Sequence, residues 1–261
     1  MNLHRMLMDL SDRQAVEHFH LQLVRSLASG PDKAHLAVKG GCNLRFFFGS
    51  VRYSEDMDLD VARDLEPHLL KEKMNRLLTG AALKAALRPA GIELAMVSAP
   101  KQTETTQRWK AELRVRGRSV ALHTKVEFSR RPTTEEAVLG ALAPNVLQEH
   151  ELLPLLARHY PLNTAIRQKV QALVGRRIVQ ARDVFDLAVL FTRAGGKVDA
   201  LASERAILPL AIERAMDVSF DDYQGQVVAY LAPEYAVTYQ SREAWDALQA
   251  QVIEALERAT S

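Results

Sequence analysis

The sequence predicts an α+β protein, in which an α/β N-terminal half is followed by an all-helical C-terminal half. Two observations predict this order. Up to residue 128, stretches that alternate apolar and polar residues stand among stretches with helical spacing, and beyond Pro161 nearly every stretch has helical spacing. Prolines separate the halves, at positions 132, 144, 154 and 161. We place the boundary near 132–145, which gives an N-terminal domain of residues 1–140 and a C-terminal domain of residues 141–261.

The first predicted element is a helix over residues 11–29, for which Ser11 is placed as the N-cap. Its apolar stripe consists of Val16, Phe19, Leu23 and Leu27. Residues 35–41 predict a short buried strand that runs into a glycine turn, and residues 42–48 predict a short helix after that turn.

Residues 55–61, EDMDLDV, alternate carboxylates with apolar side chains, which is typical of a strand with one buried face. Residues 66–87 predict a helix with Pro67 near its first turn. Three further strands are predicted at 92–99, 107–116 and 119–128, the last two joined by a hairpin at Gly117-Arg118. The predicted helices of the C-terminal half are residues 163–176, 180–194, 204–215, 219–231 and 241–258.

The composition is that of an ordinary globular protein, with 261 residues, 48% hydrophobic and 25% charged. A formal net charge of +2 neither demands nor excludes a nucleic-acid partner. The single cysteine, Cys42, excludes an internal disulfide and a thiolate zinc site. No apolar run approaches the roughly 20 residues that a membrane helix needs, and the N-terminus lacks a signal-peptide pattern. We therefore expect a cytoplasmic protein without a membrane partner.

Asp56 and Asp58 lie two positions apart in the predicted strand 55–61, so they share a face with Cα atoms roughly 7 Å apart. Two buried carboxylates at that distance raise each other's pKa unless a cation neutralises them. Oxygen ligands of this kind suit Mg²⁺ or Mn²⁺, and carboxylates that hold such ions serve phosphoryl and nucleotidyl transfer. The alternative is a half-exposed edge strand whose acids are solvated.

The surrounding segments favour a site over a solvated strand. Upstream, Gly40 and Gly41 allow the backbone to approach a ligand, and amides at the following helix start bind phosphate. Downstream, Lys125 and Glu127 share one face of another predicted strand, so that Glu127 offers a third carboxylate. A tight turn explains the glycines and a solvated strand explains Glu127 equally well when each is taken alone.

The segment 38–61 resembles the AbiEii family of nucleotidyltransferase-like toxins, which belongs to the DNA polymerase beta-like nucleotidyltransferase superfamily and includes the MenT toxins. Five motifs carry the resemblance in order: Lys39-Gly40-Gly41, Leu44-Arg45, Arg52-Tyr53-Ser54-Glu55-Asp56-Met57-Asp58, Lys125-Val126-Glu127 and Arg182-Asp183-Val184-Phe185-Asp186-Leu187. Cys42 stands where the family often has Thr or Ser, which removes one hydroxyl that could contact phosphate.

The resemblance implies a small mixed nucleotidyltransferase sheet flanked by helices. It implies that Asp56 and Asp58 hold Mg²⁺, or Mn²⁺, that bridges the phosphates of an NTP substrate, and that Glu127 is a third catalytic acid, which helps to activate the acceptor hydroxyl. Ser54 would lie near the phosphates, where its modification would silence the site. The substrate-binding residues implied are Lys39, Gly40, Gly41, Arg45, Ser54 and Lys125.

A second group of charged residues lies in the C-terminal half. Asp183 and Asp186 stand in an apolar helix, so they need partners, for which Lys169, Arg177 and Arg182 are candidates. In one interpretation, ion pairs fix this helix against its neighbour. In the other, Lys169 reaches the nucleotide phosphates and Asp183 completes the pocket. The resemblance favours catalytic roles for Lys169 and Asp183, and a structural role for Asp186.

The leading hypothesis is a metal-dependent nucleotidyltransferase, the toxin of a bacterial toxin–antitoxin system, with phage defence as its context. It would transfer NMP from an NTP to an acceptor, for which the resemblance suggests tRNA. The implied partners are RNA and a cognate antitoxin, of winged-helix type and encoded next door. Basic residues of segment 108–118 could hold an RNA backbone. The alternatives are a non-catalytic RNA- or protein-binding module of the same fold, and a protein-adenylylating enzyme.

Overall fold

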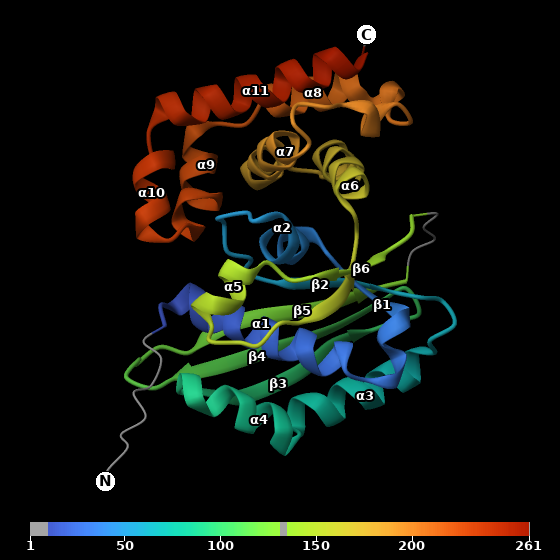
Figure 1. Cartoon of the computed structure of the whole chain (residues 1–261), viewed down its shortest axis with the longest axis vertical. Helices are drawn as coiled ribbons and strands as arrows, with labels where there is room; N and C mark the ends of the chain where they lie inside the picture. Colours follow the sequence, from blue (N-terminus) through green and yellow to red (C-terminus); the bar gives the residue numbers. More distant parts are fainter. Residues whose placement is uncertain (1–9, 131–134, 261) are drawn as a thin grey trace. The chain divides into compact units, whose positions relative to one another are not determined.

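The computed structural model describes residues 10–130 and 135–260 (Figure 1). It confirms the predicted α+β class: a mixed seven-stranded sheet with flanking helices, and a helical C-terminal region. The chain forms two compact units. Unit 1 contains the described parts of Met1–Cys42 and Ser54–His159, and unit 2 contains those of Asn43–Tyr53 and Tyr160–Ser261.

The sheet belongs to unit 1 and has the strand order β3-β4-β5-β2-β1-β7-β6. Its strands are β1 (Leu36–Lys39), β2 (Met57–Val61), β3 (Ile92–Gln102), β4 (Thr106–Val115), β5 (Leu122–Ser129), β6 (Val138–Ala141) and β7 (Leu156–His159). Strand β2 is parallel to β5 and β1 is parallel to β7, whereas the other neighbours are antiparallel. Of the predicted site residues, four lie on the central strands β1, β2 and β5: Lys39, Asp58, Lys125 and Glu127.

The helices of unit 1 begin with α1 (Asp12–Ala28), which Ser11 caps as predicted, with Gln14 completing a capping box. The prediction of a single helix over residues 66–87 was wrong, because the segment forms two helices, α3 (Pro67–Thr79) and α4 (Ala81–Leu87). The break falls at Gly80, where a Cβ atom would lie 2.7 Å from the Arg76 carbonyl oxygen. Three short helices complete the unit: η1 (Pro31–His35), η2 (Arg88–Ala90) and α5 (Pro144–Glu149).

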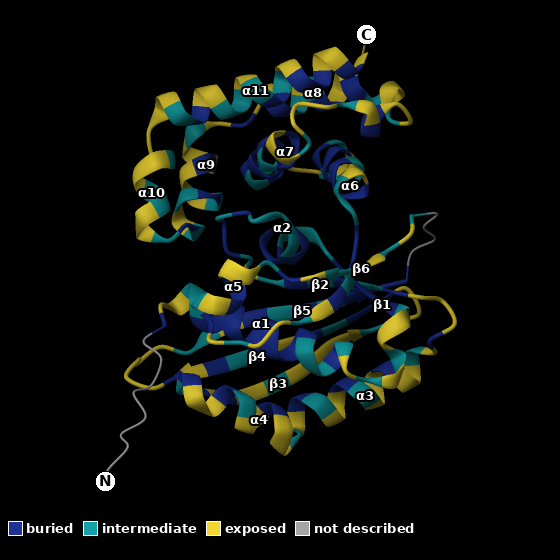
Figure 2. Ribbon diagram, viewed as in Figure 1, coloured by how far each residue is buried: buried dark blue, intermediate teal, exposed yellow. Residues whose placement is uncertain are grey.

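One face of the sheet is apolar and covered by helices. Trp109 of β4, Val126 of β5 and Met57 of β2 lie side by side in one cross-strand row and are buried. Trp109 donates from Nε1 to Asn75 of α3, which places α3 on this face. Figure 1 shows α3 and α4 along the sheet, and Figure 2 shows that their outer surfaces are exposed while the central strands are buried. The opposite face therefore receives the alternate residues of the same strands, which carry the charges.

Unit 2 is built around α7 (Ala181–Arg193), most of whose residues are buried. Its other elements are α6 (Leu162–Gly175), η3 (Asp199–Leu201), η4 (Arg205–Ile207), α8 (Leu208–Met216), α9 (Phe220–Gln226), η5 (Val228–Tyr230), α10 (Pro233–Tyr239) and α11 (Arg242–Thr260). Aromatic rings pack against this helix, with Phe185 edge-on to Tyr239 and Tyr223 stacked on Trp245. Helix α2 (Gly40–Phe48) contributes residues to both units, because the division falls after Cys42.

The division between the units at 159/160 differs from the sequence-based boundary at 140/141. Strands β6 and β7 account for the difference, since both pair within the sheet of unit 1. Residues 132–134 of the expected boundary region lie outside the described residues. Within the described ranges, helices are too short or too polar to cross a membrane.

Candidate active site

Four charged residues form a row across the polar face of the sheet. Lys39 of β1 is in register with Asp58 of β2, Asp58 with Glu127 of β5, and Glu127 with Arg108 of β4. Side chains that are directly opposite on neighbouring strands project from the same face, so two carboxylates lie side by side between two cations. The sequence predicted three of these residues as site residues, and the structure brings all three together in unit 1.

Asp58 is the carboxylate of this row without a direct partner. Among residues 10–130 and 135–260, no hydrogen bond or ion pair reaches its side chain. Burial raises the pKa of Asp58; the charges of Lys39 and Lys125 act against this rise, and those of Glu127 and Asp56 add to it. A half-buried carboxylate beside two others thus retains both oxygen atoms for a ligand.

Gly40 leaves the space in which the Asp58 carboxylate lies. Its φ of +63° is in the left-handed region, and a Cβ atom at this position would be 3.1 Å from Asp58 Oδ2. Helix α2 begins at Gly40, so the unsatisfied amides of its first turn start beside the carboxylate. The predicted glycine turn is therefore where backbone donors and the central acid meet.

Asp56 precedes β2 and is held through both its side chain and its backbone. Lys125 Nζ lies 2.7 Å from Asp56 Oδ2. The Ser54 hydroxyl donates to the Asp56 carbonyl oxygen at 2.8 Å, and the Cys42 thiol donates to the same oxygen at 3.4 Å. Ser54 thus supports the backbone that carries a predicted metal ligand, and Cys42 makes the same type of contact from α2.

Thr124 and His20 support the neighbouring peptide, which sequence reasoning missed. The Thr124 hydroxyl donates to the Glu55 carbonyl oxygen at 2.8 Å, so its oxygen accepts from His20 Nε2 at 2.7 Å. Burial lowers the pKa of His20 to about 4, although the charges of Glu17 and Asp56 favour its protonated form. A neutral imidazole with its proton on Nε2 satisfies this arrangement. Thr124 lies one position before the predicted Lys125 and projects from the other face of β5, so period-2 alternation could have identified it as buried.

Two more ion pairs fix the row. Arg108 Nε donates to Glu127 Oε2 at 2.7 Å, and Lys39 Nζ pairs with Asp60 Oδ1. Sequence reasoning did not single out Arg108. Yet the predicted hairpin at Gly117-Arg118 places Arg108 opposite Glu127, because a two-residue turn there pairs positions whose numbers sum to 235.

The carboxylates beside α2 offer the ligand chemistry of a magnesium or manganese site, although the oxygen atoms of Asp56, Asp58 and Glu127 do not all lie within 4.8 Å of one another. Asp56 and Asp58 provide oxygen atoms alone, which hard divalent cations prefer, and Glu127 adds a third carboxylate in register with Asp58. The unpaired Asp58 side chain and the space left by Gly40 are features that a bound cation would use. We therefore treat Asp56 and Asp58 as the candidate metal ligands.

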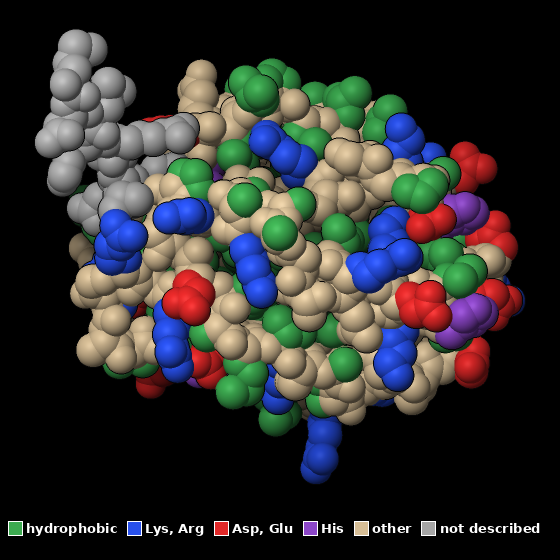
Figure 3. All heavy atoms as spheres, turned by 90° about the horizontal axis from the view of Figure 1, so that it is seen from below, with side chains coloured by type: hydrophobic (Ala, Val, Ile, Leu, Met, Phe, Trp, Pro, Cys, Tyr) green, Lys and Arg blue, Asp and Glu red, His purple; other side chains and the backbone are tan. Residues whose placement is uncertain are grey.

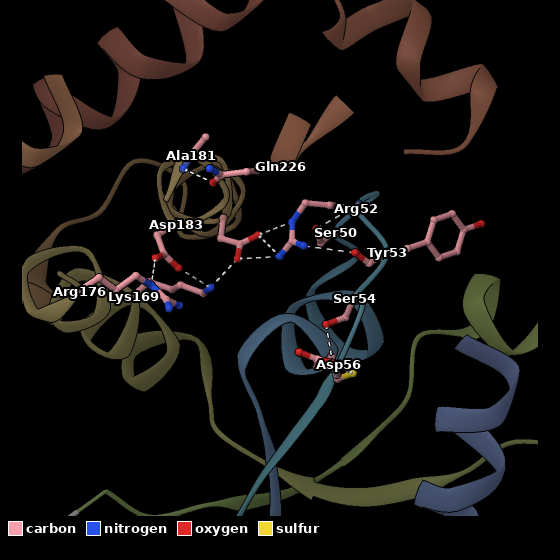
Figure 4. A network of polar contacts seen from close by, with 12 residues as sticks. Ser50, Arg52, Tyr53, Ser54, Asp56, Lys169, Arg176, Ala181, Asp183 and Gln226 are labelled. Carbon is pink, nitrogen blue, oxygen red and sulfur yellow. Dashed lines mark hydrogen bonds and ion pairs between the residues drawn. The ribbon is translucent and has the colours of Figure 1, made fainter. Parts of the chain in front are cut away.

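The second predicted group forms a buried ion network within unit 2 (Figure 4). Lys169 Nζ lies 3.1 Å from Asp183 Oδ1 and 2.5 Å from Asp186 Oδ2. Arg176 Nε donates to Asp183 at 2.5 Å, and Arg52 pairs with both oxygens of Asp186. Both aspartates have 0% exposure, so each is fully compensated rather than solvated.

The partners of these aspartates differ in part from the candidates that the sequence suggested. Lys169 is a partner, as proposed, but Arg176 and Arg52 replace Arg177 and Arg182 in the network. Arg52 was not considered because it is 134 positions from Asp186. Burial alone would raise the pKa of Asp183, but Lys169 and Arg176, through their charges and hydrogen bonds, lower it overall. This network compensates both aspartates of α7 without any ligand.

Arg45, a predicted substrate-binding residue, is 2% exposed within unit 2. Its guanidinium donates to the Ser50 carbonyl oxygen at 3.3 Å and stacks over the Tyr53 ring, 4.7 Å from the centroid. Contact with a phosphate would require the release of these interactions.

A separate polar cluster in unit 1 joins Glu17 of α1 with Glu149 and His150, and their ligand atoms lie within 4.8 Å of one another. His150 Nε2 is 2.9 Å from Glu17 Oε2, and both residues are buried. Sequence reasoning missed this group, because Glu17 is more than 130 positions away from Glu149 and His150. The Glu17–His150 hydrogen bond pairs two of the three residues directly, whereas His150 Nδ1 is buried without a hydrogen-bond partner among the described residues.

Comparison with known proteins gives one family and several related structures. The family model described as nucleotidyl transferase AbiEii toxin, type IV toxin–antitoxin system, matches residues 22–259. The fold is similar to that of a candidate nucleotidyltransferase from H. pylori, with a TM-score of 0.56 and 20% identity over 95% of this chain and 98% of that one. It is also similar to JHP933 from Helicobacter pylori, with a TM-score of 0.54 and 18% identity over 96% of both chains. No curated protein sequence matches this chain.

Proposed function

Because this chain belongs to the AbiEii nucleotidyl transferase toxin family of type IV toxin–antitoxin systems, we propose that it transfers a nucleoside monophosphate from an NTP to an RNA acceptor. Pyrophosphate leaves in this reaction, and tRNA is the first acceptor to test. The family also implies an antitoxin partner, and we propose a winged-helix protein encoded beside this chain.

The observation that carries the proposal is the placement of Asp58. Its carboxylate lies without a direct partner beside the first turn of α2, in register with Glu127. A purely structural acid at a half-buried position is normally paired, as Asp60 and Glu127 are in the same sheet. The unpaired acid is thus best explained by a ligand that carries positive charge.

Five residues in and beside the row, together with Arg108, have roles that their contacts support. Asp56 and Asp58 would hold Mg²⁺, which would neutralise the negative charge of the NTP phosphates when bound. The amides of Gly41 and Cys42 lie in the first turn of α2, where they are placed to donate to a phosphate oxygen. Arg108 holds one oxygen of Glu127. The other oxygen is then the atom that we propose accepts the proton of the acceptor hydroxyl.

RNA is proposed as the acceptor class from the resemblance to nucleotidyltransferase toxins, because the net charge of +2 does not decide for or against a nucleic acid. Lys and Arg total 34 against 32 Asp and Glu. On the face seen in Figure 3, lysines and arginines are spread among other side chains, with acidic groups towards the margins. The basic side chains among them could contact a phosphate backbone without reading a sequence.

The direct test incubates purified protein with α-³²P-labelled NTPs, Mg²⁺ and bulk tRNA. We expect label on tRNA with the wild type, and at least ~100-fold less with Asp58→Asn, because removal of a metal-binding carboxylate removes transition-state charge stabilisation. Asp246→Asn, at an exposed position of α11, is the matched control and should retain activity. Label on protein instead of RNA would replace this proposal by protein modification, and no label on either would overturn it.

A further inference from the structure

An open strand edge in unit 1 carries apolar side chains that no part of the described chain covers. Strand β6 ends the sheet, beside β7 on one side and without a strand partner on the other in residues 10–130 and 135–260 (Figure 1). Exposed large aliphatic residues gather in β6, β7 and the segment just before β7: Val138 at 42%, Leu139 at 63%, Leu153 at 75% and Leu156 at 55%. Apolar strand edges without a partner invite pairing with another chain.

The hydrogen-bond pattern identifies which backbone groups of β6 are available. Leu142 N–H donates to the Leu155 carbonyl, so 142/155 is a hydrogen-bonded pair of the β6–β7 ladder. Such pairs alternate along an antiparallel ladder. The backbone N–H and C=O groups of residues 138 and 140 therefore point towards β7. Those of Leu139 and Ala141 point away from β7, where a further strand could pair with them.

An apolar cavity lies beside this edge. It has a volume of about 270 Å³ and shares Leu139 of β6 and Leu156 of β7 with the exposed edge. The rest of its lining comes mainly from aliphatic residues of α1, β1 and β2, and two lining residues are charged, Lys33 and Arg158. Both charges are positive, so the cavity accepts an aliphatic side chain next to a group of negative charge.

We propose that β6 and this cavity bind an extended acidic segment of a partner protein. The segment adds a strand to the sheet by pairing with Leu139 and Ala141, places an aliphatic side chain in the cavity, and directs carboxylates towards Lys33 and Arg158. This surface is built from residues outside the candidate active site, and its role does not depend on the chemistry proposed there.

Charge favours this occupant over a second copy of the chain. Strand β6 itself has the sequence Val-Leu-Gly-Ala and carries no carboxylate, and Glu135 and Glu136 of a second copy lie outside the strand that would pair. A free fatty acid would match the cavity and its charge, but would leave the backbone groups of Leu139 and Ala141 unpaired.

The test uses a fluorescein-labelled ten-residue peptide that alternates leucine and glutamate, with fluorescence anisotropy as the readout on the full chain. We expect saturable binding to the wild type, and at least about tenfold weaker binding of the peptide in which lysine replaces glutamate. Ala141→Pro removes one outward N–H without breaking the β7 ladder and should weaken binding at least about fivefold. Lys33→Glu should weaken binding of the acidic peptide and improve that of the basic one.

Lys101→Glu, at an exposed position on the opposite edge strand β3, is the matched control and should leave the affinity unchanged. Thermal unfolding monitors the fold of each variant, and Lys33→Glu keeps the test valid if Ala141→Pro does not fold. Absence of binding to the wild type, or equal affinities for the acidic and basic peptides, would overturn the proposal. A dimer in sedimentation that Ala141→Pro abolishes would also overturn the proposal. So would peptide that still binds the Ala141→Pro variant and is displaced from it by decanoate.

Discussion

At the scale of single residues, the site depends on the unpaired carboxylate of Asp58 next to Gly40. The glycine has a positive φ, and its missing side chain leaves the room that Asp58 Oδ2 occupies. Two properties of one residue are thus required at the same point, a left-handed backbone and an absent Cβ atom. The two requirements can be separated by experiment, because Gly117 shares the positive φ but has no described atom within 4 Å of the point where its Cβ would lie.

Gly40→Ala should reduce nucleotidyl transfer at least about tenfold, since its Cβ would displace the Asp58 carboxylate. It should also lower the free energy of unfolding by roughly 1–2 kcal/mol, because alanine is strained at positive φ. Gly117→Ala, with φ of +80° and no atom within 4 Å of the point where its Cβ would lie, should cost similar stability but no activity. Equal activity of both variants, measured with labelled NTP, would contradict the role of Gly40.

Thr124→Val keeps the shape of the side chain and removes its hydroxyl. The Glu55 carbonyl and His20 Nε2 then lose their partner, so we expect a loss of roughly 1–3 kcal/mol of stability. Since Glu55 precedes Asp56, transfer should also fall, by about tenfold. Thr79→Val removes an exposed hydroxyl that bonds its own helix and serves as the control. Urea unfolding and the transfer assay measure both effects, and an unchanged rate would show that Thr124 does not position Asp56.

Much of the candidate site could be predicted from the spacing of residues along the chain. The alternation in residues 55–61 predicted the face on which Asp58 lies. Gly40 was expected to allow the backbone to approach a ligand. Arg108 was not identified, although the hairpin register contained the information. His20 could not be found in this way, because a helix residue is brought to Thr124 by packing, which no local pattern encodes.

At the scale of elements, α7 shows how a helix can be almost wholly buried while carrying two aspartates. Arg52 and Lys169 neutralise Asp186, and Lys169 and Arg176 neutralise Asp183. Replacing one member of such a buried group leaves an uncompensated charge, which typically costs about 3–5 kcal/mol. The contribution of these ion pairs to the free energy of unfolding should therefore depend on pH.

Asp183→Asn should destabilise the protein strongly at pH 7 and much less in acid. The folded-state pKa of Asp183 lies below its ordinary value of 3.8, so its charge adds stability above pH 3.8 that is lost as pH falls through the lower folded value. Urea unfolding at pH 7 and in steps from about pH 4 down to about pH 2 measures the difference from the wild type. Asp246→Asn is the exposed control. A difference that stays constant with pH would mean that the ionised carboxylate does not stabilise the fold.

The elements that sequence reasoning missed are the short ones. Strands β6 and β7 have four residues each and lie in a proline-rich stretch, where period-2 alternation is too brief to be recognised. Helix α6 was expected at residues 163–176, yet it begins at Leu162 with Pro161 as the N-cap. Long periodic segments such as α1 and α11 were predicted closely, because repeated apolar contacts specify them.

At the scale of the whole molecule, the chain passes between its two units three times, after residues 42, 53 and 159. Helix α2 spans the first of these points. Unfolding of either unit therefore affects a helix that contributes to the other. We expect a single cooperative transition rather than two separate ones.

The two tryptophans test this expectation, since Trp109 is buried in unit 1 and Trp245 in unit 2. Trp109→Phe leaves a reporter of unit 2, and Trp245→Phe leaves a reporter of unit 1. In each variant, the urea midpoint from tryptophan fluorescence should coincide with that from far-ultraviolet circular dichroism. Separate midpoints would show that the units unfold independently.

The central claim is that Asp56 and Asp58 hold a divalent cation beneath the phosphates of an NTP. Isothermal titration calorimetry with Mn²⁺ and a non-hydrolysable NTP measures this most directly. We expect the wild type to bind the nucleotide at least about tenfold more tightly with Mn²⁺ than without it, and Asp58→Asn to lose that difference while keeping its fold. Nucleotide binding that is equally strong in the variant, or independent of Mn²⁺ in the wild type, would contradict the claim.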